Sequence, residues 1–101
     1  MRRVARRGDR ALALVQCGED IIQVSGQIVQ SSNDTFAENR GVARFGDRVS
    51  LGCGKVGRLT QRVSRKSRVN SRRVALFNSG ITGPGILRGW VISASRTVFA
   101  G

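Results

Sequence analysis

Histidine and tyrosine are absent from this sequence, and acidic residues are scarce. Histidine is the commonest general acid or base in enzymes, and neither a paired-carboxylate motif nor a base beside a cysteine replaces it here. These absences predict that the chain has no catalytic residues and is not an enzyme. The GCGKVG stretch at residues 52–57 is interpreted as a turn, because its spacing is not that of a phosphate-binding loop.

Long hydrophobic runs and closely spaced cysteines are also missing. No stretch can span a bilayer, and ALALV at residues 11–15 is too short for the core of a signal peptide. The two cysteines, Cys17 and Cys53, have no CxxC spacing, so a disulfide, a shared metal ion and two free thiols all stay open. Of these three we expect free thiols.

Positive charge is what the chain has in excess. Its 18 lysines and arginines against six aspartates and glutamates give a formal net charge of +12. Such a balance predicts attraction to nucleic acid, anionic lipid or an acidic protein, without choosing among them. With 101 residues, of which 40% are hydrophobic and 5% aromatic, we expect one domain with a thin aliphatic core.

One pattern occurs three times along the chain. The stretch VARFGDRVSLGCGKVG at residues 42–57 aligns without a gap on VALFNSGITGPGILRG at residues 74–89. In the same way, GQIVQSSNDTFA at residues 26–37 aligns on GWVISASRTVFA at residues 89–100, and VARRGD at residues 4–9 repeats the opening turn. Because such repeats bury their apolar faces against one another, residues 1–101 are predicted to form one domain of three units. The units span about residues 4–41, 42–73 and 74–101.

Each unit is predicted to be β-structure. The runs are short, rich in valine, isoleucine, threonine, serine and phenylalanine, and bounded by glycine, asparagine and aspartate, which is typical of strands and turns. A unit is interpreted as a turn, a loop, a strand that begins at Gly26, Gly57 or Gly89, and a second short strand. The expected fold is all-β, with three hairpin units related by a pseudo-threefold axis.

The middle copy diverges most from the other two. Arg68 stands where they have phenylalanine, which indicates either a bulge turned outward or a misalignment. The four phenylalanines fall at apolar positions of the repeat and are expected in the core: Phe36, Phe45, Phe77 and Phe99.

The succession VARFGDRVS, a Gly-Cys-Gly loop, a strand that opens with glycine, and then SASRTVFAG resembles the PAAR-repeat family, named for its proline-alanine-alanine-arginine motif. The resemblance covers residues 4–101 in the register of the internal repeat. It implies a small conical β-fold with pseudo-threefold symmetry, the pointed tip of the central spike of a contractile injection machine. The implied partner is a homotrimeric β-helical spike protein, one tip per trimer, whose blunt end meets the broad base of the cone.

The resemblance also implies where segments lie. Loops at residues 10–25, 48–56 and 80–88 would converge at the sharp end, and the VAxxGD segments would lie toward the base. The residues expected at the spike-binding base are Val42, Ala43, Phe45, Val74, Phe77 and Trp90, the last as a core or base residue.

Two features depart from the family pattern. The proline of the naming motif is missing, since Gly41 and Val42 stand at its place in one copy. Many family members hold zinc near the apex through three histidines and a cysteine, and this chain has no histidine. With Cys53 and Cys17 as the only soft ligands, an apical zinc or iron ion would bind weakly, so no cofactor is expected.

The basic segment at residues 58–73 supports a different interpretation. Clustered positive charge is enough to bind RNA or DNA, so a basic, ribosome-associated protein is the alternative. The segment lacks interleaved aromatics for stacking on bases, and we therefore expect nucleic acid not to be the partner. We expect instead an outward basic face suited to anionic lipid or lipopolysaccharide, made of Arg58, Arg62, Arg65, Lys66, Arg68, Arg72 and Arg73.

The function that these observations favour is structural. A rigid tip would cap the spike and concentrate the force of contraction on the target outer membrane. The expected location is the distal tip of the central spike of a phage tail baseplate, in the virion. A type VI secretion tip, made in the bacterial cytoplasm and exported by contraction, is the second setting.

Overall fold

Strands make up the regular structure of the computed structural model, which describes residues 2–101. The local cause is alternation: in RALALVQC the side chains of Ala11, Ala13 and Val15 are buried, whereas Leu12 and Leu14 point outward. A period of two is that of a strand with one face on the core. The predicted all-β class is confirmed. No described residue belongs to a helix that is long and apolar enough to cross a membrane.

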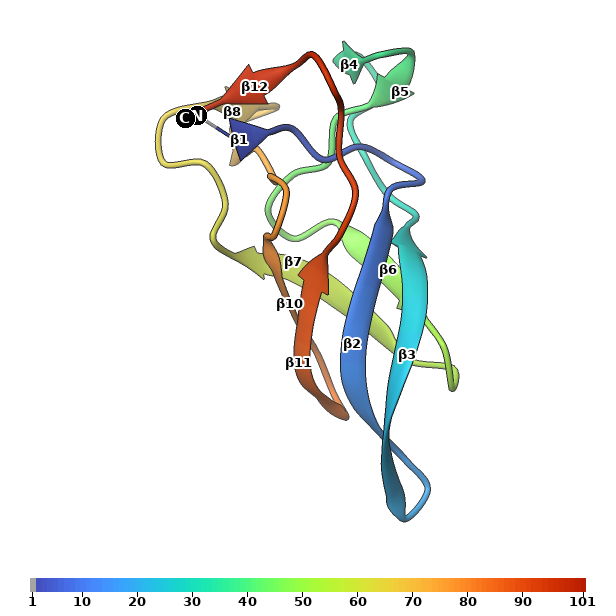
Figure 1. Ribbon diagram of the computed structural model, residues 1–101. Helices are drawn as coiled ribbons and strands as arrows, with labels where there is room; N and C mark the ends of the chain where they lie inside the picture. The colour runs from blue at the N-terminus through green and yellow to red at the C-terminus, as the bar shows by residue number, and fades with distance from the viewer. Residues whose placement is uncertain (1) are drawn as a thin grey trace.

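Three hairpins close into a barrel (Figure 1), with strand order β10-β11-β2-β3-β6-β7 and antiparallel pairing throughout. Alanine, valine, leucine and isoleucine fill its interior, because a barrel of so few strands leaves little room for larger side chains. The strands are β2 (Arg10–Cys17), β3 (Asp20–Ile28), β6 (Arg48–Leu51), β7 (Val56–Gln61), β10 (Gly80–Thr82) and β11 (Ile86–Val91).

Three two-stranded ladders lie at the opposite end of the molecule from the barrel hairpin turns (Figure 1). In two of them the strands are joined by two residues with positive φ, Glu38-Asn39 and Asn70-Ser71, which is the geometry of a tight hairpin turn. The third ladder pairs the two ends of the chain. The strands are β1 (Arg2–Arg3) with β12 (Phe99–Ala100), β4 (Phe36–Ala37) with β5 (Arg40–Gly41), and β8 (Arg68–Val69) with β9 (Arg72–Arg73).

A closed ring of three backbone hydrogen bonds joins the three VA segments between the barrel and the ladders. The N–H of Ala5 donates to the carbonyl of Ala75 (2.9 Å), Ala75 donates to Ala43 (2.9 Å), and Ala43 donates to Ala5 (3.0 Å). All three alanines are fully buried, so a larger side chain has no room there. The segments of residues 4–6, 42–44 and 74–76 therefore meet one another although they are far apart in the sequence.

The predicted loop at residues 10–25 is wrong. Residues 10–28 form the longest hairpin, in which β2 and β3 pair residue by residue from Arg10–Gln27 to Cys17–Asp20. The strand that was expected to begin at Gly26 thus begins six residues earlier. Gly26 lies within β3, where an added Cβ would clash with the carbonyl of Ser50 on β6, so glycine is required by the close approach of two strands.

The expectation of four core phenylalanines is also wrong. Phe36, Phe45 and Phe99 are exposed, and Phe77 is half-buried. Phe36 and Phe99 are the first residues of β4 and β12, and in both strands the first residue faces outward while the second is buried. Their places in the core are taken by smaller residues of the neighbouring positions, such as Ala37 and Ala100.

Candidate docking face

The end of the molecule formed by the six short strands presents large side chains to solvent; we call it the ladder face. Phe36, Arg68 and Phe99 are the first residues of β4, β8 and β12. Phe36 is 61% exposed, Phe99 is 48% exposed, and Arg68 is exposed as well. The pairing of β8 with β9 has no bulge at Arg68, and the ladder face carries two aromatic rings and a cation at the first residues of three short strands.

Contacts between neighbouring ladders hold this face together. The carboxylate of Glu38 accepts hydrogen bonds from the backbone N–H of Arg96 (2.9 Å) and the hydroxyl of Thr97 (3.0 Å). The Asn70 side-chain amide donates to Asp34 (3.1 Å), and the hydroxyl of Ser64 donates to the carbonyl of Gly101. The turn or end of each ladder is therefore bonded to the loop that precedes another ladder.

Glu38 is ionised over a wider pH range than an ordinary glutamate. The backbone N–H of Arg96 lowers the pKa of Glu38, and the hydroxyl of Thr97 and the positive charge of Arg6 act in the same direction. The guanidinium of Arg6 lies 2.8 Å from this carboxylate. The carboxylate of Glu38 is therefore a negative charge held in place at the edge of the ladder face.

Two buried aspartates accept hydrogen bonds in the turns that follow the first two VA segments. Asp9 accepts the backbone N–H of Arg6 (2.7 Å) and two bonds from its guanidinium (3.0 and 3.1 Å). Asp47 accepts the same set from Arg44, at 2.8, 3.0 and 3.0 Å. The hydrogen bond to Asp9 raises the pKa of Arg6, against an opposing effect of burial. In each segment the carboxylate neutralises a buried guanidinium and caps the turn.

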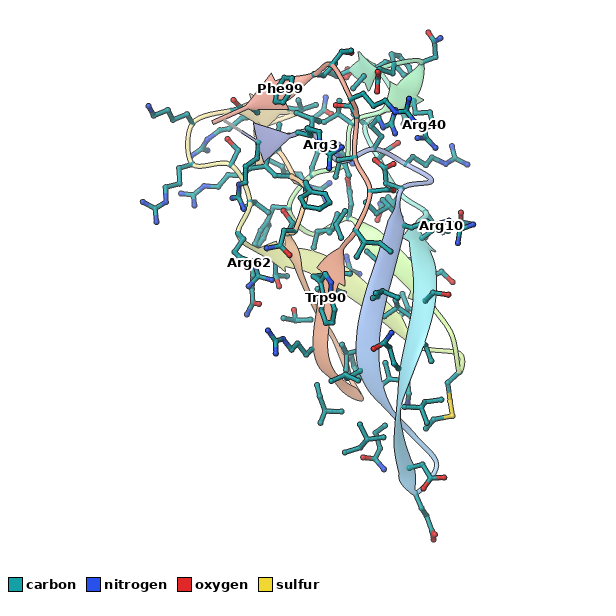
Figure 2. The ribbon with its side chains drawn as sticks, viewed as in Figure 1. Arg3, Arg10, Arg40, Arg62, Trp90 and Phe99 are labelled. Carbon is teal, nitrogen blue, oxygen red and sulfur yellow. A yellow bond between two sulfur atoms is a disulfide. The ribbon has the colours of Figure 1, made fainter. Side chains whose placement is uncertain are left out.

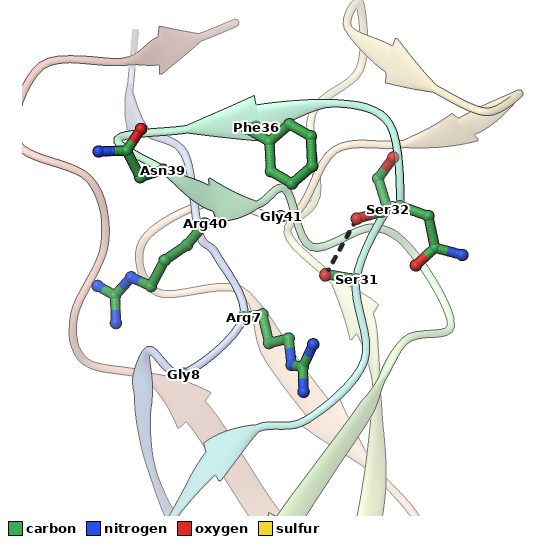
Figure 3. Close-up of a pocket in the computed structure, with 9 residues that line it drawn as sticks. Arg7, Gly8, Ser31, Ser32, Phe36, Asn39, Arg40 and Gly41 are labelled. Atoms are coloured by element: carbon green, nitrogen blue, oxygen red, sulfur yellow. Dashed lines mark hydrogen bonds between the residues drawn. The ribbon is translucent and has the colours of Figure 1, made fainter.

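A cavity of about 420 Å³ lies beside the ladder β4–β5 (Figure 3). The ring of Phe36 forms one wall of this cavity, and the side chains of Arg7 and Arg40 also line it. Arg40 also lies 3.3 Å from the carboxylate of Asp9. The sequence did not single out Arg7, Arg40 or this cavity, although Phe36 was marked by its place in the repeat.

A second cavity of about 340 Å³ lies beside the ladder β8–β9. It brings together Phe45 with three residues of the predicted basic face, Arg68, Arg72 and Arg73. Arg72 also donates to Asp47 (2.8 Å) and to the carbonyl of Phe45 (2.9 Å). Both cavities combine a phenylalanine with arginines, which suits apolar and acidic side chains of a partner.

The rest of the predicted basic face is not gathered in one place. Arg58 and Arg62 belong to the barrel side, where their guanidinium groups donate to the carbonyls of Gly46 (3.0 Å) and Asn78 (2.9 Å). Arg65 and Lys66 are exposed in the loop before β8. The basic segment therefore contributes to both the barrel wall and the ladder face.

Three residues predicted for the base are buried rather than exposed. Ala43 belongs to the core of the barrel, and Val42 and Val74 belong to a second apolar cluster with Ala37 and Ala100 of the ladders. Of the aromatic residues, Phe45 is exposed in the second cavity, and Phe77 lies under the guanidinium of Arg3, 4.7 Å from the ring centroid.

Trp90 lies neither in the core nor on the ladder face. Figure 2 shows it on the flank of the barrel, away from Arg3 and Phe99 at the ladder end. Its neighbours Gly89 and Val91 are buried, so the alternation of β11 points the indole outward.

The two cysteines form a disulfide rather than free thiols (Figure 2). Cys17 ends β2 and Cys53 lies in the turn between β6 and β7, at the end of the barrel away from the ladders. Both sulfur atoms are used in the bond, whereas a metal requires thiolate, so the predicted metal ligands are replaced by a covalent cross-link. Among residues 2–101 no group of three or more His, Cys, Asp or Glu side chains is placed to hold a metal ion.

Comparison with known proteins adds no relative. No family model matches the chain, and no curated protein or solved structure is detectably similar to it. Any assignment of function must therefore rest on the motifs and on the geometry described above.

Proposed function

We propose that this protein is the structural tip of a contractile injection machine and that its ladder face caps a homotrimeric β-helical spike. The observation that carries the proposal is the ring of hydrogen bonds among Ala5, Ala43 and Ala75. A single chain that presents three similar segments around a common centre can make a similar contact with each of three identical subunits. A chain without such internal similarity could not contact all three subunits in the same way.

Further contacts support three related units. Each VA segment is followed by a barrel hairpin and then by strands of a ladder. The turn N–H groups of Gly8, Gly46 and Asn78 donate to Ile28, Leu59 and Val91, which lie at or near the ends of the second hairpin strands, at 2.8, 2.6 and 3.0 Å. Recurrence of the same bonds at the same positions is the expected consequence of a pseudo-threefold axis.

The two ends of the molecule suit the two tasks of a tip. The molecule is elongated, about 40 × 23 × 20 Å. The ladder face would serve as the base, since it offers aromatic rings, cations and two cavities to the spike. The barrel end would serve as the point. There the disulfide ties β2 to the β6–β7 turn, and the N–H of Gln16 donates to Gly85 of the β10–β11 turn (2.8 Å).

The proposed mechanism is mechanical. Contraction would push the spike forward, and the load would pass through the ladder face into a barrel in which a disulfide cross-links two of the three hairpins at the point. The proposed setting is the distal end of a phage tail spike, with a type VI secretion spike as the second setting, and the target is the outer membrane.

Equivalence of the three units predicts that the chain tolerates circular permutation at the ladders. Arg2 pairs with Ala100, so Gly101 and Met1 stand in sequence where the other ladders have a two-residue turn. A permutant that joins Gly101 to Met1 and opens between Glu38 and Asn39 should keep the wild-type β-sheet spectrum by circular dichroism and melt within a few degrees of wild type.

The matched control joins the same ends but opens between Gly26 and Gln27, inside a barrel strand, and should not fold. Equal behaviour of the two permutants, or failure of the first, would contradict the equivalence of the ladders.

Binding to the spike tests the function itself. We expect the purified protein to form a complex with its homotrimeric β-helical spike protein, with one tip per trimer by light scattering. The double variant Phe36→Glu and Phe99→Glu should weaken binding by roughly 30-fold or more, as for the loss of about 2 kcal/mol at a hot spot.

The matched control places the same charges at the other end of the molecule. Ile21 and Leu87 are as exposed as the two phenylalanines but lie near the barrel hairpin turns, so Ile21→Glu with Leu87→Glu should bind normally. A complex with three tips per trimer, no complex at all, or equal losses in both variants would refute the proposal. Salt-sensitive binding to RNA in place of the spike would favour the nucleic-acid alternative.

A further inference from the structure

The outer surface of strands β2 and β11 carries apolar side chains where a solvent-facing sheet usually carries polar ones. Trp90 on β11 is paired with Leu12 on β2, and Arg88 is paired with Leu14. Along β2 the two leucines alternate with the buried residues Ala11 and Ala13, so the leucines and their partners on β11 are on the face of the sheet that points away from the core. The indole and the two leucines are only partly buried, so an apolar strip is open to solvent.

Two exposed arginines border this strip. The guanidinium carbon of Arg88 lies 5.6 Å from the centroid of the Trp90 ring, which is the arrangement of a cation–π contact. Arg62 follows β7 and is oriented by the bond from its Nε to the carbonyl of Asn78 (2.9 Å). A cavity of about 330 Å³ lies beside the strip and has no acidic side chain in its lining. It is lined by Arg62, Asn78, Arg88 and Trp90.

We propose that the Trp90 patch, made of Leu12, Leu14, Arg62, Arg88 and Trp90, binds the surface of an anionic phospholipid bilayer. Indole rings favour the boundary between headgroups and acyl chains, since one edge is polar and the rest apolar. Arginine guanidinium groups bind lipid phosphates by charge-assisted hydrogen bonds, and the leucines add apolar area at the same depth. The patch supplies these three elements on one wall of the barrel.

Other occupants fit the patch less well. A second copy of the chain is disfavoured, because each carries a net charge of +12 and the patch itself is basic. Nucleic acid would use the arginines but leave the leucines without a contact, and one face of the indole is already covered by Arg88. An anionic bilayer uses both the charge and the aliphatic groups.

This inference rests on the proposed function for its biological setting, in which the flank of the tip meets the envelope after the point. Its test does not depend on the spike. Lipid binding is measured on the isolated protein, so loss of lipid binding with intact spike binding would overturn only the inference. Intact lipid binding without a spike complex would overturn only the proposed function.

Fluorescence of Trp90 gives a direct readout, because the chain has a single tryptophan. Vesicles of phosphatidylcholine mixed with phosphatidylglycerol should shift its emission to shorter wavelength, and high salt should reverse the shift. Neutral vesicles of phosphatidylcholine should cause little change. An equal shift with both vesicle types, or no shift with either, would refute the proposal, as would a larger shift with duplex DNA.

Charge-matched double variants separate the patch from general attraction. Arg62→Gln with Arg88→Gln should weaken binding to the anionic vesicles by roughly 30-fold, the effect expected from two arginines at the lipid surface. The control, Arg48→Gln with Arg58→Gln, removes two exposed arginines from β6 and β7 on the opposite wall of the barrel. It should lose at most a few-fold.

The two pairs also match in their internal bonds, since Arg58 donates to the carbonyl of Gly46 as Arg62 donates to that of Asn78. Circular dichroism of each variant verifies the fold, and Trp90 is kept in both. Equal losses in the two pairs would show that binding depends on net charge alone and would refute a localised patch.

Discussion

Replacing both Cys17 and Cys53 by serine is expected to lower the free energy of unfolding by about 4 kcal/mol, because the disulfide closes a loop of intermediate length. The two residues are 36 positions apart and join the longest hairpin to a turn of the next one. Urea unfolding of the variant and of the oxidised wild type gives the difference. For a small domain this is a large fraction of the total stability.

Chemical reduction of the wild type supplies the control, and should give the same loss without any change of sequence. Hydrogen exchange should then locate the effect, with faster exchange at the ends of β2 and β3 and little change at Ala5, Ala43 and Ala75 beyond the global loss. If the reduced protein were as stable as the oxidised one, the disulfide would not stabilise this end of the barrel, and the prediction would be wrong.

Asp47→Asn is expected to cost about 3–5 kcal/mol, as when one partner of a buried ion pair is removed. The carboxylate is 0% exposed and accepts bonds from the backbone and the guanidinium of Arg44 and from Arg72. An amide would leave the guanidinium of Arg44 buried without an opposite charge. Thermal and urea unfolding measure the loss.

The turn at residues 76–79 provides the matched control for this prediction. There Leu76 and Ser79 stand in place of the arginine and the aspartate, and the N–H of Leu76 donates to the Ser79 hydroxyl at 2.8 Å. The double variant Arg44→Leu with Asp47→Ser copies this pair, keeps the cap of the turn and removes the buried charge. It should be more stable than Asp47→Asn, although it removes more groups. The opposite order would show that Arg72 and Asn70, which also contact the pair, carry most of its stability.

Strand content and the positions of three turns were accessible from local pattern. The turns after Val4, Val42 and Val74 were recognised because each needs a glycine or asparagine with positive φ, and Gly8, Gly46 and Asn78 have it. The cavities beside the ladders were not accessible, because their walls come from segments that touch only after folding. Arg7 and Ser31, which line one of them, are far apart in the sequence.

Two errors show where local pattern fails. In ALALV both faces are apolar, so alternation of burial is hidden until the partners of β2 are known, and the hairpin was taken for a loop. The phenylalanines were assigned to the core because they fall at apolar positions of the repeat. Here the alanine next to Phe36 or Phe99 occupies the core position instead, which a hydrophobicity pattern cannot distinguish in strands of two residues.

Composition and spacing alone established the all-β class, the positive charge and the absence of histidine and tyrosine, because each is a property of residue types or of residues close together in the chain. Whether the two cysteines pair, which rings face solvent, and how three alanines bond in a ring depend on contacts between segments tens of residues apart. Those contacts are selected by closure of the whole barrel, since each strand must satisfy its backbone groups with two neighbours at once.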